Sequence, residues 1–451
     1  MKMGKTLEKI LGFCKRWKKT LIAGGAALAV LAGSAGYGWK NIYHACCKYS
    51  WNQYKTQRDK VDIEKNDLEV RVDESSQNVY VKSLIELNNK GEDISLTLGH
   101  GFKIDYAEIN SQETTARRDL LNSRIVTLNN QQEGLCKVVL HYHGRIQDKF
   151  IERAGVHRDF NELSPLSGWY ISDFDSFPSY RISVTVPTDH IAIAPGNLVS
   201  VAEKGDNRVF TYETCRVMNP TVITGKFEQE SRKIGDVTIN LYYSTYDKRR
   251  IGRLFEQSSK IIDLYSRLFG NLGNSTYTFV ELPDDAGKNY NCGSMVVFKK
   301  GDGWTLPLLS HEIAHYWWGG EVKYVRSESE FNESLAEFCR LVAAEKLQSK
   351  KWFEHELAQM ESIFYNYPEL PDICETTGYD DYSSHVFRFK GPFAIQKLRE
   401  EMGEETFFKG LKDYFRQEKH KISSVKRFQE VMQENSEKDL SKFFEKYFGK
   451  K

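Results

Sequence analysis

Two histidines four residues apart, with a glutamate directly after the first, constrain this chain more than any other feature. His311, Glu312 and His315 form an H-E-x-x-H motif, and Glu333 follows eighteen residues after His315. On a helix, residues i and i+4 share one face, so both imidazoles point the same way. Two imidazoles and a carboxylate supply three ligands of a tetrahedral zinc site and leave a fourth position open for water. The pattern therefore predicts a catalytic site for one Zn²⁺ ion.

Two further glutamates have predicted roles at this site. Glu312 stands where it can take a proton from a water that attacks a carbonyl. The residues around the motif are mostly apolar, so its helix is expected to be buried, where paired histidines need a metal to offset their cost. Glu337 lies one turn beyond Glu333 and is a candidate acceptor for a ligand histidine N–H; a solvated carboxylate is the alternative. These residues indicate a zinc hydrolase.

With these residues, the chain resembles the aminopeptidase N-like family of zinc metallopeptidases, gluzincins with a thermolysin-like catalytic domain. The family's Trp-Gly and Asn-Glu segments are matched by Trp317-Trp318-Gly319 and Asn332-Glu333-Ser334. Similarity upstream, between Gly168 and Gly196, and downstream, between Phe389 and Phe448, extends the resemblance over roughly residues 60–450. It implies a zinc-dependent peptidase with a peptide or protein substrate, in a short form without the large C-terminal helical domain of longer relatives.

The segment that would hold the substrate departs from the family pattern. The family binds the substrate's amino group with the Glu of a Gly-x-Met-Glu-Asn motif, which corresponds here to Gly293, Ser294, Met295 and Val296. We expect these four residues to line the substrate, but a valine cannot pair with an ammonium ion. Recognition of the substrate N-terminus is therefore expected to be altered.

A second departure concerns the group that stabilises the oxyanion. The tyrosine of the family corresponds to Arg388. Arginine is a permanent donor that can stabilise an oxyanion, but it can equally bind a substrate carboxylate. Tyr379, Tyr382 and His385 are nearby alternatives for the missing role. We predict Arg388 as a catalytic residue beside Glu312.

The amino-terminal region carries a membrane-targeting pattern. Residues 1–19 contain seven lysines and arginines, and the following stretch, residues 20–39, is uncharged and about long enough to span a bilayer. Basic residues before such a segment predict a cytoplasmic tail, a single-pass anchor in the cell membrane and an extracytoplasmic catalytic domain. A cleaved signal peptide ending at Ala35, and hence a secreted protein, is the alternative. Residues 40–59 are expected to connect this segment to the folded part.

The remaining periodicity predicts a multidomain α+β protein. Residues 60–245 show period-two strands separated by turns, which favours an all-β sandwich. Helical periodicity begins near Arg250, and residues 246–451 are predicted to form the zinc peptidase domain, mainly α and ending in a helical subdomain. Within it, Thr276–Leu282 and Cys292–Phe298 are predicted to be strands, and the second is a candidate for the edge along which a peptide lies.

Composition excludes some functions and leaves one alternative. With 63 basic and 62 acidic side chains the formal charge is +1, so nothing indicates a nucleic-acid surface. The sequence contains no glycine-rich phosphate-binding loop, which argues against nucleotide binding. The altered positions Val296 and Arg388 also suit a catalytically inactive peptidase-fold protein that binds or scaffolds partners at the membrane, whereas the complete zinc motif favours an enzyme.

Overall fold

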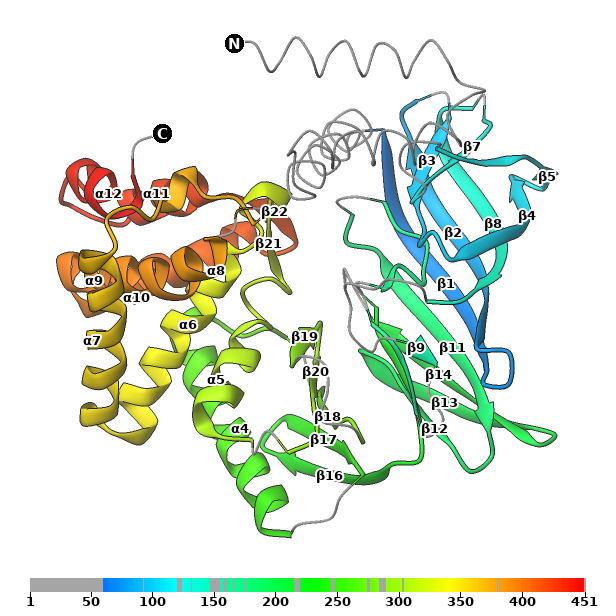
Figure 1. The fold of residues 1–451 in the computed structure, drawn as a ribbon, viewed down its shortest axis with the longest axis horizontal. Helices are drawn as coiled ribbons and strands as arrows, with labels where there is room; N and C mark the ends of the chain where they lie inside the picture. The colour runs from blue at the N-terminus through cyan, green and yellow to red at the C-terminus, as the bar shows by residue number, and fades with distance from the viewer. Residues whose placement is uncertain are drawn as a thin grey trace, which may run out of the picture. The chain divides into compact units, whose positions relative to one another are not determined.

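The fold is taken from a computed structural model. It describes residues 60–449 except 92, 120–123, 131, 147–154, 157–159, 165–166, 174–175, 215–219, 245–247, 274–275, 284–288, 302–303, 379 and 381. Strands form most of the chain up to residue 243, and helices form most of it from residue 248 onward (Figure 1). The predicted α+β organisation, with an N-terminal β-sandwich and a mainly helical domain after it, is confirmed.

An eight-stranded sheet forms the larger layer of the β domain, in the order β13-β14-β11-β1-β2-β8-β4-β5. Its strands are β1 (Val61–Asp73), β2 (Asn78–Asn89), β4 (Phe102–Ile109), β5 (Gln112–Glu113), β8 (Gly134–Gly144), β11 (Ser179–Pro187), β13 (Asn197–Lys204) and β14 (Asn207–Thr214). Along β2, alternate residues are buried and accessible, as expected for a strand with one face on a core.

Two smaller sheets complete the β domain. One contains β3 (Ile94–Thr97), β7 (Ile125–Leu128) and β6 (Ala116–Arg118); the other contains β12 (Ile191–Ile193), β15 (Val222–Gly225), β10 (Phe160–Leu163) and β9 (Gly155–Val156). Buried residues from all three sheets join in one hydrophobic cluster, which includes Trp169. The domain is therefore held by a core shared between layers.

The part of the chain that carries the predicted zinc ligands begins with a five-stranded sheet, whose strand order is β16-β17-β18-β20-β19. Its strands are β16 (Glu228–Ile234), β17 (Val237–Tyr243), β18 (Thr276–Glu281), β19 (Tyr290–Cys292) and β20 (Met295–Phe298). Strand β17 pairs in parallel with β18, and helix α4 (Lys248–Phe269) makes the crossover. The predicted boundary at residue 245 thus falls inside one paired unit, because strand periodicity alone does not reveal which strands pair.

The order of this sheet also revises the predicted substrate edge. Cys292–Phe298 is not one strand: Gly293 adopts a φ of 58° and turns the chain between β19 and β20. Strand β20 is then enclosed between β18 and β19, and β19 forms the edge. A left-handed glycine converts the expected single strand into a tight hairpin.

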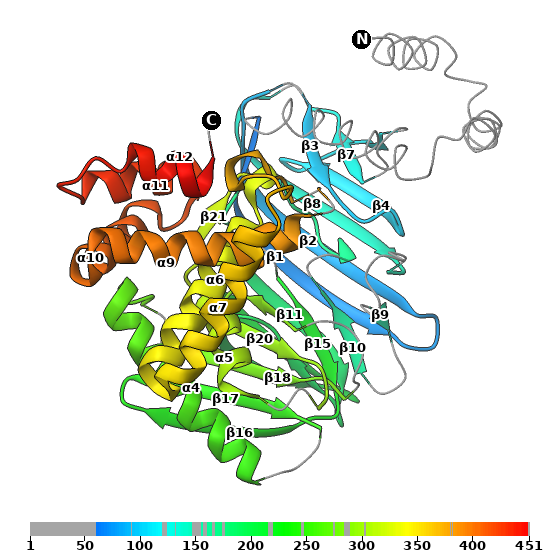
Figure 2. The same cartoon turned by 60° about the vertical axis from the view of Figure 1, so that its left-hand side comes forward.

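The helices that follow this sheet pack mostly into the largest hydrophobic cluster of the described residues, and a smaller cluster around Met360 and Phe393 adjoins them. They are α5 (Leu306–Ala314), α6 (Phe331–Ala343), α7 (Lys350–Asn366), α8 (Ser383–His385), α9 (Gly391–Met402), α10 (Glu404–Glu418), α11 (Val425–Glu434) and α12 (Ser441–Phe448), with short strands β21 (Val322–Tyr324) and β22 (Lys421–Ser423). Short 3₁₀ turns at Arg326–Glu328 and Ile373–Glu375 and π-helical turns at Ala344–Gln348 and Val386–Lys390 connect them. Figures 1 and 2 show α4 and α5 lying against the five-stranded sheet.

The predicted tail, apolar segment and connector, residues 1–59, lie outside the described residues. Among the helices that the structure does describe, none combines the length and the hydropathy that a bilayer crossing requires.

Candidate metal centre

Helix α5 places the H-E-x-x-H motif inside the protein. Pro307 occupies the first turn, where its missing N–H costs no hydrogen bond. The helix ends just before His315, and Gly319 turns the chain back with a φ of 104°. A Cβ at Gly319 would lie 2.7 Å from the side-chain nitrogen of Asn332, beside the third predicted ligand. The motif is thus packed directly against the start of α6.

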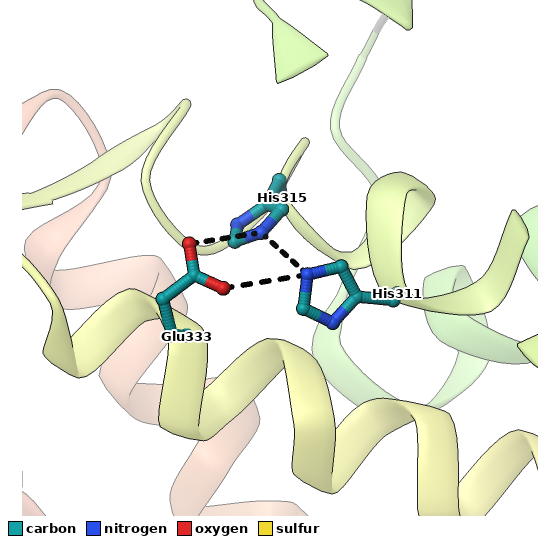
Figure 3. A group of neighbouring side chains, drawn as sticks. All are labelled: His311, His315 and Glu333. Carbon is teal, nitrogen blue, oxygen red and sulfur yellow. Dashed lines mark hydrogen bonds and ion pairs between the residues drawn. The ribbon is translucent and has the colours of Figure 1, made fainter. Parts of the chain in front are cut away.

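The three predicted ligands meet at one point between α5 and α6. Figure 3 shows the imidazoles of His311 and His315 and the carboxylate of Glu333 pointing toward one another. The Nε2 atoms of the two histidines are 3.2 Å apart. They lie 3.3 Å (His311) and 3.6 Å (His315) from the carboxylate oxygens of Glu333.

This spacing fits a zinc ion. Two ligands each about 2.0–2.1 Å from an ion, at a tetrahedral angle, lie about 3.3–3.4 Å apart, close to the three distances between the Nε2 and carboxylate atoms. The imidazoles are buried, with 7% and 8% of His311 and His315 exposed, although their ring nitrogens face one another. A divalent cation between the two rings would make this close approach of the nitrogens favourable, because each nitrogen can then donate an electron pair to the ion.

The outer nitrogens of the imidazoles are anchored in the way that metal-binding histidines usually are. Nδ1 of His315 lies 3.0 Å from the backbone oxygen of Trp318. Nδ1 of His311 lies 3.2 Å from a carboxylate oxygen of Glu337, so this side chain stands where the sequence suggested. Arg340 holds the other oxygen of Glu337 at 2.6 Å.

Electrostatics at the site favour positive charge between the helices. Burial by itself lowers the pKa of His311, but the carboxylates of Glu333 and Glu337 outweigh it and raise that pKa to about 10. Burial also opposes ionisation of Glu337, yet His311 and Arg340 lower its pKa to about 2. A bound cation would supply the positive charge that these carboxylates stabilise.

Glu312 lies on the wall of a cavity of about 230 Å³ together with the three predicted ligands. Its side chain is buried, and burial raises its pKa above the usual range, although the nearby histidines oppose the shift. A raised pKa is the direction that a carboxylate general base requires. Tyr316 also lines this cavity, and among the described residues its buried hydroxyl has no hydrogen-bond partner.

Arg388 reaches the same cavity from a distant part of the chain. Its guanidinium lies 2.8 Å from a carboxylate oxygen of Glu333 and 3.4 Å from one of Glu337. It sits in the π-helical turn Val386–Lys390, a distortion that is frequent at functional sites. Ser334 donates a hydrogen bond of 2.8 Å to the backbone oxygen of Phe387, which fixes this turn against α6.

A close approach of backbones makes that contact possible. A Cβ at Gly391 would overlap the hydroxyl of Ser334, so only glycine lets the chain pass so near α6. Of the alternatives to Arg388, Tyr379 lies outside the described residues, Tyr382 is more than half exposed, and the ring of His385 is exposed and tilted by 33° against that of Phe389. Neither Tyr382 nor His385 lines the cavity.

The four residues expected to line the substrate separate in the structure. Gly293 lines the zinc-site cavity, whereas Ser294 lines an adjoining one. Met295 and Val296 are fully buried in β20, Val296 in the same hydrophobic cluster as α5. The cavity wall is formed instead by β19 and its flanks, and the buried side-chain amide nitrogen of Asn291 there lacks a partner among the described residues. The turn at Gly293 separates the four residues.

Glu337 should tune the metal affinity without binding the ion. Glu337→Gln is expected to weaken zinc binding by about 10- to 100-fold, because the charged acceptor beside Nδ1 of His311 becomes a neutral amide that orients and polarises the ring less strongly. Competition with a chromogenic zinc chelator measures the change. Glu356→Gln is the matched control, since Glu356 shares Arg340 with Glu337 at 2.8 Å and belongs to neither the ligand set nor the cavity wall. Equal zinc affinities for the two variants would show that Glu337 does not contribute to metal binding.

Comparison with known proteins places this geometry in context. Residues 302–447 match the Peptidase family M1 domain. The chain is 21% identical over 306 residues to "Probable aminopeptidase 2" of Sulfurisphaera tokodaii, covering 60% of this chain and 38% of that protein. It is 19% identical over 274 residues to "Aminopeptidase M1" of Arabidopsis thaliana, covering 55% and 31%. The chain thus spans less than half the length of either relative.

Solved structures share the fold over most of the chain. A crystal structure of an M1 zinc metallopeptidase mutant from Deinococcus radiodurans superposes with a TM-score of 0.73 at 16% identity, covering 86% of this chain and 94% of that one. The same mutant bound to a Tyr-Ser-Ala substrate gives a TM-score of 0.72, with coverage of 87% and 95%. The chain therefore contains a segment, residues 302–447, similar to the Peptidase family M1 domain, and shares the fold of M1 zinc metallopeptidases over most of its length.

Proposed function

We propose that the protein is a zinc-dependent metallopeptidase that hydrolyses peptide bonds and recognises the substrate N-terminus differently from its aminopeptidase relatives. The observation that carries the proposal is the convergence of His311, His315 and Glu333 on one point, beside a buried Glu312 on the same cavity wall. A zinc ion held there supplies Lewis-acid activation of a carbonyl and of water. This activity is supported by a relative named as a probable aminopeptidase and by a similar crystal structure that holds a bound peptide substrate.

The protein's own side chains perform the remaining steps. The Glu312 carboxylate accepts the proton of the attacking water and later returns it to the leaving amine. Helix α5 fixes Glu312 next to His311, so no reorganisation is needed for this transfer. Strand β19, at the edge of the five-stranded sheet, is proposed to offer backbone groups to an extended peptide, as in other cases of strand addition.

Arg388 is proposed to stabilise negative charge on the scissile carbonyl oxygen. Arg388→Ala is expected to lower kcat by about 10²- to 10³-fold with little change in KM, because the charge develops only in the transition state. Arg388→Lys should recover part of the loss, since it keeps the charge but not the planar fork.

Steady-state kinetics on a fluorogenic peptide measure both variants. Arg340→Ala is the control, because Arg340 also pairs with Glu337 and is not among the cavity-lining residues. A rise in KM with unchanged kcat would instead make Arg388 a site for a substrate carboxylate.

A mixed peptide library tests the function as a whole. We expect the zinc-loaded protein to cleave library peptides, with products read by mass spectrometry, and the Glu312→Gln protein to leave them intact. Cleavage by both proteins would reject the mechanism. Intact peptides with both proteins, despite bound zinc, would favour the inactive binding or scaffold protein.

A further inference from the structure

Strand β13 forms an unprotected edge of the eight-stranded sheet. Among the described residues it pairs only with β14, so its outer edge presents backbone N–H and C=O groups without a neighbouring strand. All eight of its residues are exposed, and only the last two, Glu203 and Lys204, are charged. Proteins usually guard such an edge with charged side chains or proline, because a bare edge pairs with extended chains that meet it. Residues 197–202 are therefore open to the addition of a strand.

The middle of β13 is apolar. Leu198, Val199 and Val201 have 44%, 46% and 46% of their surface exposed. Leu198 is paired with Tyr212 and Val201 with Phe210, and both aromatic residues belong to the core of the β domain. Cross-strand partners share one face of a sheet. Leu198 and Val201 therefore continue the core-facing side of the sheet to its edge, where an added strand would cover them.

The start of β13 is connected to the zinc-site cavity. The backbone N–H of Gly196, directly before β13, donates a hydrogen bond of 3.2 Å to the hydroxyl of Ser294, next to the turn between β19 and β20. Val199 is an extra residue in the register between β13 and β14, a bulge of the kind that re-aims a side chain. Together with Asn197 it lines the adjoining cavity of about 610 Å³, and Gly293 lines both this cavity and that of the zinc site. A chain that leaves the zinc site through the adjoining cavity therefore reaches the open edge of β13.

We propose that β13 is a docking strand for the substrate: an extended stretch of an unfolded polypeptide adds to its edge while another part of the same polypeptide occupies the zinc site. This inference rests on the proposed peptidase function and adds the substrate class, namely polypeptides long enough to reach both places. Backbone hydrogen bonds to β13 provide affinity, and Leu198 and Val201 select apolar side chains at alternate positions of the substrate. A second copy of the protein or another segment of the same chain could also cover this edge, but the continuity with the zinc-site cavity favours the substrate.

Binding to a non-cleaving protein tests the proposal without relying on activity. The zinc-loaded full-length Glu312→Gln protein is mixed with reduced, carboxymethylated α-lactalbumin, an unfolded polypeptide, or with the tripeptide Tyr-Ser-Ala, which spans about 10 Å at most. We expect the unfolded polypeptide, but not the tripeptide, to slow amide hydrogen exchange in β13, as measured by mass spectrometry.

A double variant tests the apolar side chains of β13. Leu198→Ser combined with Val201→Ser should weaken binding of the unfolded polypeptide by about 10-fold and leave the affinity for the tripeptide unchanged, because only the longer chain covers these side chains. Leu135→Ser is the matched control, since Leu135 is an exposed leucine on β8 of the same sheet. Zinc content and thermal melting establish that each variant is folded.

Three results would overturn the proposal. The first is that the polypeptide does not bind or binds without protecting β13, which decides the matter even if the double variant fails to fold. The second is equal affinity of the folded double variant and Leu135→Ser for the polypeptide. The third is full protection of β13 before any substrate is added. Protection that rises with protein concentration would assign the edge to a second copy, and protection independent of concentration would assign it to another segment of the same chain.

The outcomes for β13 and for the peptidase are separable. Cleavage of short peptides that depends on Glu312 would keep the proposed function even if β13 binds nothing. Absence of Glu312-dependent cleavage of any peptide would reject the peptidase, whereas protection of β13 is measured in a protein that does not cleave.

Discussion

Replacing Glu312 by glutamine is expected to lower peptide turnover by about 10²- to 10⁴-fold, the usual contribution of a positioned general base. The amide keeps the size of the side chain but cannot accept the proton of the attacking water. Glu312 is not one of the three residues whose side-chain atoms converge at the candidate zinc site. Zinc content and melting temperature should therefore stay at the wild-type level. The loss should appear in kcat, since the proton moves in the transition state.

Kinetics and metal analysis on the same preparations check this expectation. Glu354→Gln is a suitable control, because Glu354 is 59% exposed on α7 and pairs only with Lys350 among the described residues. A Glu312→Gln protein with wild-type turnover, purified free of other proteases, would refute the assigned base. A protein that loses zinc would instead show that Glu312 supports the metal site structurally.

Removing a zinc ligand should abolish both metal binding and activity. His315→Ala deletes one of three donors that the structure brings within 4.8 Å of one another, and a catalytic zinc site with two remaining protein ligands is incomplete. Zinc binding to the native state should raise the stability of the intact protein by about 4 kcal/mol at a free zinc concentration 1,000-fold above Kd. The variant should show no such gain.

Thermal melting with and without a zinc chelator measures this coupling, with bound zinc determined by atomic emission. His355→Ala is the control, since His355 is exposed on α7 and its ring contacts Gln359. The intact protein and the control should melt at a lower temperature after chelation, and His315→Ala should not respond. A chelator-dependent shift that persists in His315→Ala would place the metal elsewhere.

The zinc site was predictable because its information is local. Residues i and i+4 of a helix share a face whatever the helix packs against, so His311 and His315 had to converge once α5 formed. The apolar surroundings indicated burial, and the Asn-Glu pair marked Glu333 on the next helix. The strand and helix periods likewise separated a β domain from a helical one. In each case a short stretch of sequence carries the pattern.

The substrate side of the site depended on contacts between distant segments. Arg388 lies 55 residues from Glu333 in the sequence, and their ion pair requires the π-helical turn and the close passage of Gly391 along α6. Strand order placed β19 at the sheet edge and enclosed β20, because Gly293 turns the chain. A linear pattern does not specify these pairings.

Glu321 shows the same division most clearly. The sequence contains a signal, an acidic residue directly after two glycines in an otherwise apolar run, but that signal does not say where the carboxylate faces. Only the packing of α5, β21 and the segment of Lys419 and His420 brings it to the cavity wall. The sequence by itself predicted the metal, its candidate ligands and the candidate general base, because helical geometry is local. Tertiary structure decided which residues line the cavity, because its wall is assembled from segments that meet only when the chain is folded.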